Sequence, residues 1–317
     1  MKYFVTGGAG FIGSNLVDRL LLDGNEVVVY DNFSTGEAQF LVEHRHNPNL
    51  NLIFGDILDE NSLQRSMRGC DFVFHLAANA DVRHGTEHPG KDLRINTVGT
   101  HEVLEAMRHN NIKKIAFSST GSVYGECSVI PTPENAPFPI QTSLYGASKL
   151  AGEGLIQAYC EGFGFQAWIF RFVSILGERY SHGHVYDFVK QLNEHPYYLN
   201  VLGDGTQKKS YLNVKDCING IFCAINNSNE KVNIFNLGTD EYVEINESID
   251  ILRIYLRINP KINYSGGSRG WVGDNPFILL DCNKIRNIGW KPKHTIKESI
   301  EQTIDYLSKN KWLLEVK

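Results

Sequence analysis

The chain has 317 residues, of which 42% are hydrophobic and 21% are charged, so it can bury a large core in one domain or two. Its 36 acidic residues exceed its 31 Lys and Arg, and the formal net charge of −5 argues against a broad electrostatic surface for nucleic acid. The six cysteines include no C-x-x-C pair and predict reduced thiols in a cytoplasmic protein. The first residues lack the features of a signal peptide, and no run approaches the roughly 18 apolar residues of a membrane span.

Short apolar runs alternate with helical patterns through the first half of the chain. Apolar runs predict strands at 3–5, 26–30, 52–54, 72–76, 112–118 and 166–173. Apolar residues at helical spacing predict helices at 11–22, 60–67, 89–109 and 144–163. This alternation predicts an α/β fold with a doubly wound parallel sheet of the Rossmann type, covered on both faces.

The pattern becomes looser after about residue 174. One further strand is predicted at 232–237, and helices are predicted at 245–256 and 296–307. We therefore predict a dinucleotide-binding domain over 1–174 and a smaller C-terminal α/β substrate-binding lobe over 175–317. Some of the later chain is expected to return to the first domain.

A glycine turn follows the first predicted strand. Gly8-x-Gly10-x-x-Gly13 fits the dinucleotide fingerprint, and a second pattern that starts at Gly7 overlaps it. Glycine lets the backbone approach a pyrophosphate, and the following helix N-terminus supplies N–H donors and a positive dipole. The alternative is a plain strand–turn–helix junction.

The residue that closes the second predicted strand selects between cofactors. Asp31 can accept hydrogen bonds from the adenosine ribose hydroxyls, and its charge would repel the extra phosphate of NADP. The next Lys or Arg after it is Arg45. The sequence therefore predicts NAD.

A tyrosine and a lysine lie one helical turn apart near the middle of the chain. Tyr145 and Lys149 are an i, i+4 pair, and Ser143 is the expected N-cap, which places the phenol in the first helical turn. The helix dipole, the lysine and the positive charge of an oxidised nicotinamide would favour a phenolate. A base near neutral pH needs the phenol pKa lowered by roughly 3 from its usual value of ~10. Alone, this spacing is more often a surface helix pair.

The stretch 117–125 supports a catalytic role for Tyr145 and Lys149. It follows a predicted strand, so the hydroxyl of Thr120 should lie at the carboxyl edge of the sheet, where ligands bind. The alternative for Thr120 is a strand-end residue that bonds only to the backbone.

Together these motifs resemble the extended short-chain dehydrogenases/reductases, and most closely the UDP-galactose 4-epimerase group of nucleotide-sugar epimerases. The resemblance covers essentially the whole chain. It is carried by T-G-G-A-G-F-I-G-S at 6–14, Tyr30-Asp31-Asn32, Gly55-Asp56-Ile57, His75-Leu76-Ala77-Ala78, Asn96, S-S-T-x-x-V-Y-G at 118–125, Y-x-x-x-K at 145–149, Leu202-Gly203-Asp204-Gly205-Thr206 and the segment 269–274.

The resemblance implies roles for individual residues. The catalytic residues would be Thr120, Tyr145 and Lys149. NAD would be bound by Gly7, Gly10, Phe11, Ile12, Gly13, Asp31, Asn32, Asp56, Ile57, Leu76, Ala77, Ala78, Asn96, Tyr145, Lys149 and Phe172. The substrate would contact Thr120, Tyr145, Ser174, Lys209, Arg269 and Ile278. Without the resemblance, Asp56 could equally be a turn residue.

Two substrate positions depart from the family pattern. Ser174 stands where the family usually has asparagine, and Lys209 stands where an arginine usually holds the diphosphate. Lysine keeps the charge but loses the planar, bidentate fork. Ile278 matches the position that limits sugar size in the family, so an N-acetylated sugar is a further hypothesis.

The resemblance implies a UDP-hexose 4-epimerase that works through a transient 4-keto sugar and forms a homodimer through helices near 89–109 and 144–163. Alternatives are another reaction of the family on a nucleotide sugar (2-epimerase, 4-keto reductase or 4,6-dehydratase) and a non-catalytic dinucleotide-binding sensor. The family's dehydratases carry an acidic residue just after the Ser/Thr, whereas this chain has Gly121 and Ser122, which also speaks against the decarboxylases. No metal is expected, since His182 and His184 have no third ligand nearby in the sequence, and His44 and His46 are read the same way.

Overall fold

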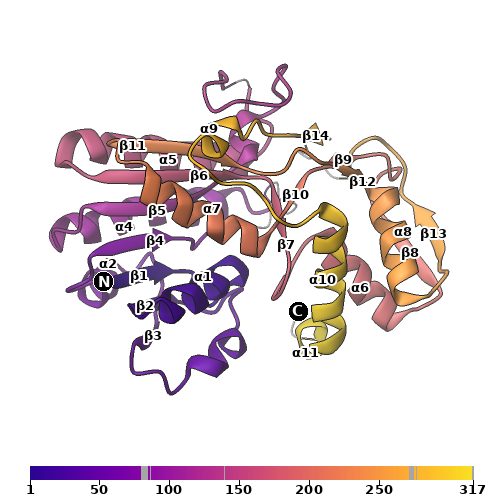
Figure 1. The fold of residues 1–317 in the computed structure, drawn as a ribbon, viewed down its shortest axis with the longest axis horizontal. Coiled ribbons are helices and arrows are strands. Elements are labelled where there is room, and N and C mark those ends of the chain that lie inside the picture. Colours follow the sequence, from indigo (N-terminus) through magenta and orange to yellow (C-terminus); the bar gives the residue numbers. More distant parts are fainter. Residues whose placement is uncertain (80–84, 86, 139, 271–274, 276, 316–317) are drawn as a thin grey trace. The chain divides into compact units, whose positions relative to one another are not determined.

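The protein is described by a computed structural model that covers all residues except 80–84, 86, 139, 271–274, 276 and 316–317 (Figure 1). It divides into two compact units. The first comprises Met1–Gly125, Phe138–Arg171 and Ile221–Phe235, and the second comprises Glu126–Pro137, Phe172–Gly220 and Asn236–Lys317.

This division differs from the predicted one in residues 172–174 and in the segment Glu126–Pro137, which belong to the second unit. Backbone hydrogen bonds explain the assignment, because Thr132 donates to Leu279 at 2.8 Å and accepts from Asp281 at 2.9 Å. These pairings join residues about 150 positions apart in sequence, so no local pattern in the chain signals them.

A seven-stranded sheet forms the centre of the first unit, in the order β11-β6-β5-β4-β1-β2-β3 (Figure 1). β1 pairs in parallel with both β2 and β4, and Val5 lies opposite Val29 on one side and Phe74 on the other. The order reverses beside β1, which creates a topological switch point where ligands bind in such sheets. The strands are β1 (Lys2–Thr6), β2 (Glu26–Asp31), β3 (Leu50–Phe54), β4 (Phe72–His75), β5 (Lys114–Thr120), β6 (Gln166–Phe172) and β11 (Val232–Leu237). The predicted α/β fold with a parallel sheet is confirmed.

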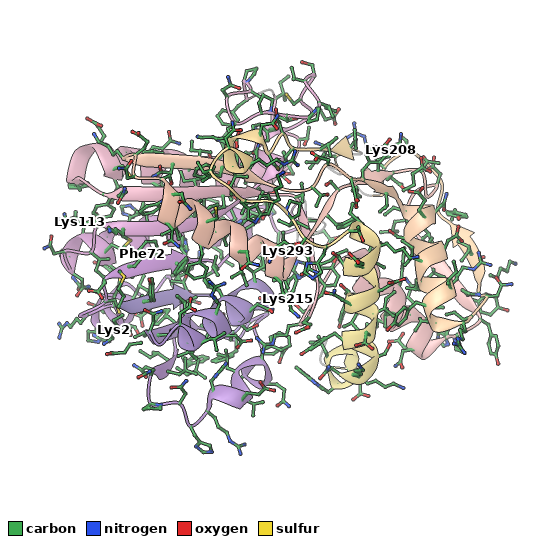
Figure 2. All side chains as sticks on the ribbon, viewed as in Figure 1. Lys2, Phe72, Lys113, Lys208, Lys215 and Lys293 are labelled. Atoms are coloured by element: carbon green, nitrogen blue, oxygen red, sulfur yellow. The ribbon has the colours of Figure 1, made fainter. Side chains whose placement is uncertain are left out.

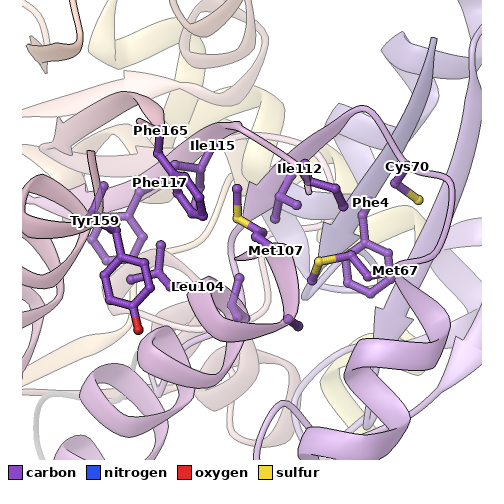
Figure 3. Close-up of a cluster of buried hydrophobic side chains, with 14 of the residues drawn as sticks. Phe4, Met67, Cys70, Leu104, Met107, Ile112, Ile115, Phe117, Tyr159 and Phe165 are labelled. Carbon is purple, nitrogen blue, oxygen red and sulfur yellow. The ribbon is translucent and has the colours of Figure 1, made fainter. Parts of the chain in front are cut away.

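One face of the sheet packs against α2 (Glu60–Ser66), α4 (Gly99–His109) and α5 (Leu144–Phe163). Figure 3 shows this cluster, in which Phe4 and Phe117 from strands meet Met67, Met107 and Tyr159 from the helical side.

The other face carries α1 (Phe11–Leu22) and the later part of α7 (Val214–Asn227). Phe72, labelled in Figure 2, stacks on Trp168 at 5.7 Å, and Phe74 contacts the ring of Phe222 at 6.1 Å. Burial of both faces explains why the strands read as continuous apolar runs.

The predicted helix over 89–109 is divided into three parts. α3 (Pro89–Asp92) continues through a π-helical turn, η2 (Leu93–Val98), into α4. Asn96, inside this turn, is 1% exposed. A π turn is rare in soluble proteins and frequent at functional sites.

The second unit is built from helices and three small sheets. Its sheets pair β10 (Tyr211–Asn213) with β7 (Ser174–Leu176), β13 (Lys261–Tyr264) with β8 (Tyr198–Val201), and β9 (Lys208–Lys209) with both β12 (Val243–Glu244) and β14 (Phe277–Ile278). Its helices are α6 (His184–Glu194), the first part of α7, α8 (Ile245–Leu256), α9 (Asn283–Arg286), α10 (Ile296–Lys309) and α11 (Trp312–Glu315). Capping boxes begin α8 and α10, which agree with the helices predicted there.

All six cysteines are free thiols. Within the described part of the chain, no helix combines the length and the apolar character that crossing a membrane would require.

Candidate active site

The glycine turn between β1 and α1 leaves no room for side chains. Gly7 has φ +68°, and a β-carbon on it would lie 2.7 Å from the amide nitrogen of Ala77. A β-carbon on Gly13 would lie 2.1 Å from the carbonyl oxygen of Gly7. Gly10 is the N-cap of α1 and provides no side-chain cap. The turn therefore brings bare backbone to a helix N-terminus, the arrangement that accommodates a pyrophosphate.

Asp31 shapes the end of β2 as well as carrying charge. Its two carboxylate oxygens accept hydrogen bonds from the amides of Ala9 and Phe33, both at 2.9 Å. Burial raises the pKa of Asp31, and the two amide donors oppose that rise. Each oxygen keeps a second lone pair that a ribose hydroxyl can use.

Four other predicted cofactor residues follow the ends of β2, β3 and β4: Asn32, Asp56, Leu76 and Ala77. Asn32 donates to the carboxylate of Asp56 at 3.1 Å, and Asp56 also accepts from the amide of Leu58 at 2.9 Å, so it has the turn role as well. The hydroxyl of Thr6 accepts from the amides of Leu76 and Ala77, both at 3.2 Å. The glycine cradle and the ribose-side carboxylate fit a bound dinucleotide.

Tyr145 lies in the first turn of α5. Ser143 is the N-cap, as predicted, and its side chain accepts from the amide of Gly146 at 3.0 Å. Thr120 ends β5, and its side chain lies near enough to the phenol of Tyr145 to lower the phenol pKa. Thr120 also accepts from the amide of Ser122 at 3.1 Å, so it combines the backbone role with a contact to the tyrosine.

Lys149 is 2% exposed, and two contacts within the first unit fix its ammonium group. Its ammonium nitrogen donates to the carbonyl of Ser118 at 2.8 Å and lies 4.7 Å from the centre of the Phe117 ring. Burial lowers the pKa of Lys149 to about 7, and the charges of Glu153 and Asp92 oppose that fall. The ammonium is therefore only partly charged near neutral pH.

The groups of the protein alone hold the pKa of Tyr145 above its usual value. Burial raises it to about 12, the charge of Asp92 adds to the rise, and Thr120 opposes it. Loss of solvent around Tyr145 and Lys149 disfavours the charged form of each. The lowered pKa of a base near neutral pH stays a prediction, which depends on the positive charge of an oxidised nicotinamide.

We expect Lys149 to destabilise the fold at low pH. Its pKa is about 7 in the folded protein and near 10.5 when exposed, so the unfolded chain binds more protons between these values. The cost is fully present below pH 7 and is lost as the pH rises to 10.5. The free energy of unfolding should therefore rise relative to that of Lys149→Met by about 4 kcal/mol across this range. Urea unfolding of both proteins from pH 6 to 10 tests this, and parallel curves would contradict it.

A buried ion pair behind Thr120 was not predicted from the sequence. Arg171 and Glu153 are 2% and 0% exposed, and their closest contact is 2.7 Å. Glu153 also accepts from Ser119 at 2.5 Å, and Arg171 donates to the hydroxyl of Tyr124 at 2.7 Å. Only the spacing of Lys149 and Glu153, which places them one turn apart on α5, could have indicated from the sequence that Glu153 lies near the site.

The second unit holds the predicted substrate residues apart from Thr120 and Tyr145. Lys209 on β9 lies directly opposite Ile278 on β14, and its ammonium group donates to the carbonyl of Asn275 at 2.7 Å. Arg269 forms a half-exposed ion pair with Glu126 at 2.7 Å.

Three further residues singled out in the sequence, Ser174, Phe172 and His184, also lie in the second unit. Ser174 is exposed and pairs with Tyr211 across β7 and β10, and Phe172 is buried at the end of β6. His184 is half-buried and bonds the hydroxyl of Tyr211 at 3.0 Å; burial lowers its pKa to about 3. The motif residues 271–274 lie outside the described residues. Across the described ranges, no group of three or more His, Cys, Asp or Glu side chains is arranged to hold a metal ion.

Residues 3–238 match the NAD dependent epimerase/dehydratase family. The chain belongs to this family. Like the family, it is an NAD-dependent enzyme that modifies nucleotide sugars.

Three relatives of this epimerase/dehydratase chain illustrate the range of the family. A putative UDP-glucose 4-epimerase of Methanocaldococcus jannaschii is 34% identical over 315 residues, covering 96% of this chain and 98% of that protein. A crystal structure of a UDP-galactose 4-epimerase is 35% identical with a TM-score of 0.88, covering 98% and 100% of the two chains. DesIV, a dTDP-glucose 4,6-dehydratase from Streptomyces venezuelae crystallised as a double mutant with NAD, is 26% identical with a TM-score of 0.92 and full coverage of both chains.

Proposed function

We propose that the protein is a UDP-hexose 4-epimerase. The observation that carries the proposal is the Thr120 side chain, which lies near enough to the phenol of Tyr145 to lower its pKa, beside a segment, 121–125, that contains no carboxylate. An epimerase needs one group to move a proton at the sugar C4 hydroxyl and one to hold its oxygen. Water elimination needs a further acid for the leaving hydroxyl.

Residues of the first unit perform these two tasks. Tyr145 takes the proton of the C4 hydroxyl, and Thr120 hydrogen-bonds the same oxygen. NAD, when bound, supplies a hydride acceptor and donor next to a positive charge. Burial raises the pKa of Tyr145 to about 12, so its use as a base needs the positive charge of Lys149 and of the bound nicotinamide. Tyr145 then returns the proton to the C4 oxygen. Inversion requires that a hydride be given back to the opposite face of the 4-keto sugar, chemistry that the cofactor held by the glycine turn and Asp31 would supply while ending in its original oxidation state.

The charge of one residue and the names of the relatives support a nucleotide-diphosphate sugar as the substrate. Lys209 offers a cation for a diphosphate, as a point charge without the fork of arginine. Relatives at 34% and 35% identity carry the names UDP-glucose and UDP-galactose 4-epimerase, whereas the dehydratase relative named above is 26% identical. Backbone similarity alone does not choose between the reactions, because that dehydratase has the higher TM-score of the two structures.

The test is incubation of the NAD-loaded protein with UDP-, dTDP-, CDP- and GDP-hexoses, followed by proton NMR. A 4-epimerase brings UDP-glucose and UDP-galactose to the same mixture from either side. Replacement of the C6 methylene signals by a methyl signal, as a 4-keto-6-deoxy sugar forms, identifies a dehydratase. No change in any sugar, with NAD still bound, favours the sensor alternative.

We further propose that Ile278 leaves room for an N-acetylated sugar, and we expect Ile278→Tyr to remove that substrate selectively. Ile278 is half-buried and lies opposite Lys209 in the small sheet. A larger ring there should lower kcat/KM for UDP-N-acetylglucosamine by roughly 10- to 100-fold through overpacking, with little change for UDP-glucose. Ile278→Val is the matched control. Equal losses for both sugars would contradict the assignment.

We propose that the protein is a homodimer through the helices of 89–109 and α5. Leu93, Val98 and Leu144 on these helices are 58%, 40% and 44% exposed. Light scattering should then give twice the chain mass of 35.8 kDa. A mass of one chain that Leu93→Asp does not alter would contradict this arrangement.

A further inference from the structure

His75, the last residue of β4, is a buried histidine that uses both of its ring nitrogens. Its side chain is 1% exposed. Its Nδ1 lies 2.8 Å from the hydroxyl of Thr6 at the end of β1, and its Nε2 lies 3.0 Å from the hydroxyl of Thr100 in the first turn of α4. The ring therefore bridges the strand that precedes the glycine turn and the helix that follows the π turn η2.

The other partners of Thr6 fix the direction of its hydrogen bond to the ring. The Thr6 hydroxyl accepts from the amides of Leu76 and Ala77, both at 3.2 Å. A hydroxyl has two lone pairs and one proton, so both lone pairs are used and the proton is left for His75. Nδ1 of His75 therefore accepts this bond and carries no proton.

The partners of Thr100 give the same result from the other side of the ring. The Thr100 hydroxyl donates to the carbonyl of Asn96 at 2.6 Å, a bond back to the residue four positions earlier in the chain. Because its one proton is used there, this hydroxyl accepts from His75, and Nε2 is the protonated nitrogen. Two independent contacts thus select one neutral tautomer.

The surroundings of the ring oppose a second proton. A proton on Nδ1 would face a hydroxyl whose lone pairs are already used. The ring of Phe117 lies 5.5 Å from that of His75, and the ammonium of Lys149 lies 4.7 Å from the centre of the same Phe117 ring. Burial and the charge of Lys149 lower the pKa of His75 to about 3, so the ring is neutral near neutral pH.

At its β1 end, this network holds two backbone segments together. The Thr6 hydroxyl holds the amide of Ala77, and a β-carbon on the next residue, Gly7, would lie 2.7 Å from the same amide nitrogen. His75 orients that hydroxyl by accepting its proton. The glycine turn and the segment that follows β4, both expected to contact NAD, are therefore placed by one set of hydrogen bonds.

At its other end, the network reaches the catalytic helix through Asn96. The side-chain amide of Asn96 donates to the hydroxyl of Ser148 at 3.0 Å, and that hydroxyl donates to the carbonyl of Tyr145 at 2.8 Å. The residue whose carbonyl accepts from Thr100 thus also holds the first turn of α5.

We propose that His75, neutral and protonated on Nε2, is a positioning residue that joins the cofactor-binding turn to the first turn of α5 through Thr6 and Thr100. The inference rests on the proposed placement of NAD along the glycine turn and of the reaction at Tyr145. It concerns how these segments are held and not which sugar reacts, so the two can fail separately.

The first test determines the tautomer in the unaltered protein. Long-range ¹H–¹⁵N NMR of the ¹⁵N-labelled full chain distinguishes a protonated from an unprotonated ring nitrogen. His75→Gln assigns the signal among the 11 histidines, and contacts to the Phe117 ring assign it if that variant folds poorly. We expect a proton on Nε2 and none on Nδ1, without change between about pH 5 and 9. A proton on Nδ1, whether alone or in a charged ring, would overturn the proposal.

The second test measures whether the network positions the segments expected to bind NAD. Thr6→Val leaves the amide of Ala77 and Nδ1 of His75 without this partner, so it should weaken NAD binding by roughly 10-fold in calorimetric titration. Thr6→Ser restores the hydroxyl and should rescue the affinity. Thr303→Val is the matched control, because Thr303 is equally buried and its hydroxyl also joins two backbone groups, at 2.8 and 2.7 Å. It should lower the melting temperature without changing the Kd for NAD.

Thr100→Val breaks the network from its other end and keeps the test decisive if Thr6→Val folds poorly. It should also raise the Kd for NAD, by a smaller factor, because it releases the ring that orients Thr6. An unchanged Kd in both valine variants, or an equal loss of affinity in Thr6→Ser and Thr6→Val, would show that these side chains contribute packing alone and would overturn the proposal. The expected tautomer and a raised Kd in a protein that epimerises no sugar would support His75 while refuting the proposed function.

Discussion

Tyr145→Phe should lower kcat for sugar epimerisation by roughly 1000-fold. The substitution removes only the phenol oxygen, which is the group we assign to proton transfer at C4 and whose ionisation Thr120 favours. Affinity for NAD should change little, since the glycine turn and Asp31 remain intact. Proton NMR of the sugar equilibrium measures the rate, and calorimetric titration with NAD measures the binding.

The matched control for this variant is Tyr197→Phe, which removes the same atom from a side chain that is 75% exposed. It should keep full activity. If Tyr145→Phe retained turnover within about tenfold of the original protein, Tyr145 would not be the group that transfers the proton. A protein with bound NAD and no turnover in either form would instead be a sensor.

Local sequence patterns predicted most elements of the first unit. The helices Phe11–Leu22 and Leu144–Phe163 begin and end where the apolar spacing placed them, and Ser143 caps the second as expected. Periodicity succeeds here because each helix packs one face on a sheet that is buried on both sides. The cluster of Gly7, Asp31 and Asp56 at neighbouring strand ends follows from the parallel order of β1, β2 and β3.

Features that depend on burial could not be predicted in this way. The segment Leu93–Val98 contains no Gly or Pro that would mark a break, so the sequence predicts one regular helix across the π turn. The pKa of Tyr145 moves upward because solvent is lost around it, and solvent loss is a property of the folded unit. Asp92, whose charge acts on Lys149 across 57 positions, has no local signature that separates it from a capping residue.

Glu153→Gln should lower the free energy of unfolding by about 3 to 5 kcal/mol, because it leaves the guanidinium of Arg171 buried without a counter-charge. Both side chains are at most 2% exposed, and the lost carboxylate also accepts from Ser119. The melting temperature should fall by roughly 5 to 10 °C, as measured by circular dichroism. Because Glu153 also favours the charged form of Lys149, the pKa of Lys149 should fall in the same variant.

We expect Glu153→Gln to lose stability because its ion pair is buried, and not because an ion pair as such is lost. A second, exposed ion pair in the chain tests this distinction. Lys231 and Glu161 also meet at 2.7 Å, but their side chains are 55% and 79% exposed. Glu161→Gln makes the same change in a pair of the same length and should leave the melting temperature unchanged, since solvent already screens that pair. Adding Arg171→Met to Glu153→Gln should recover part of the stability, because no unbalanced charge then remains buried. If the two glutamate variants melted alike, or if the double variant lost the sum of both single losses, the pair behind Thr120 would contribute as ordinary packing.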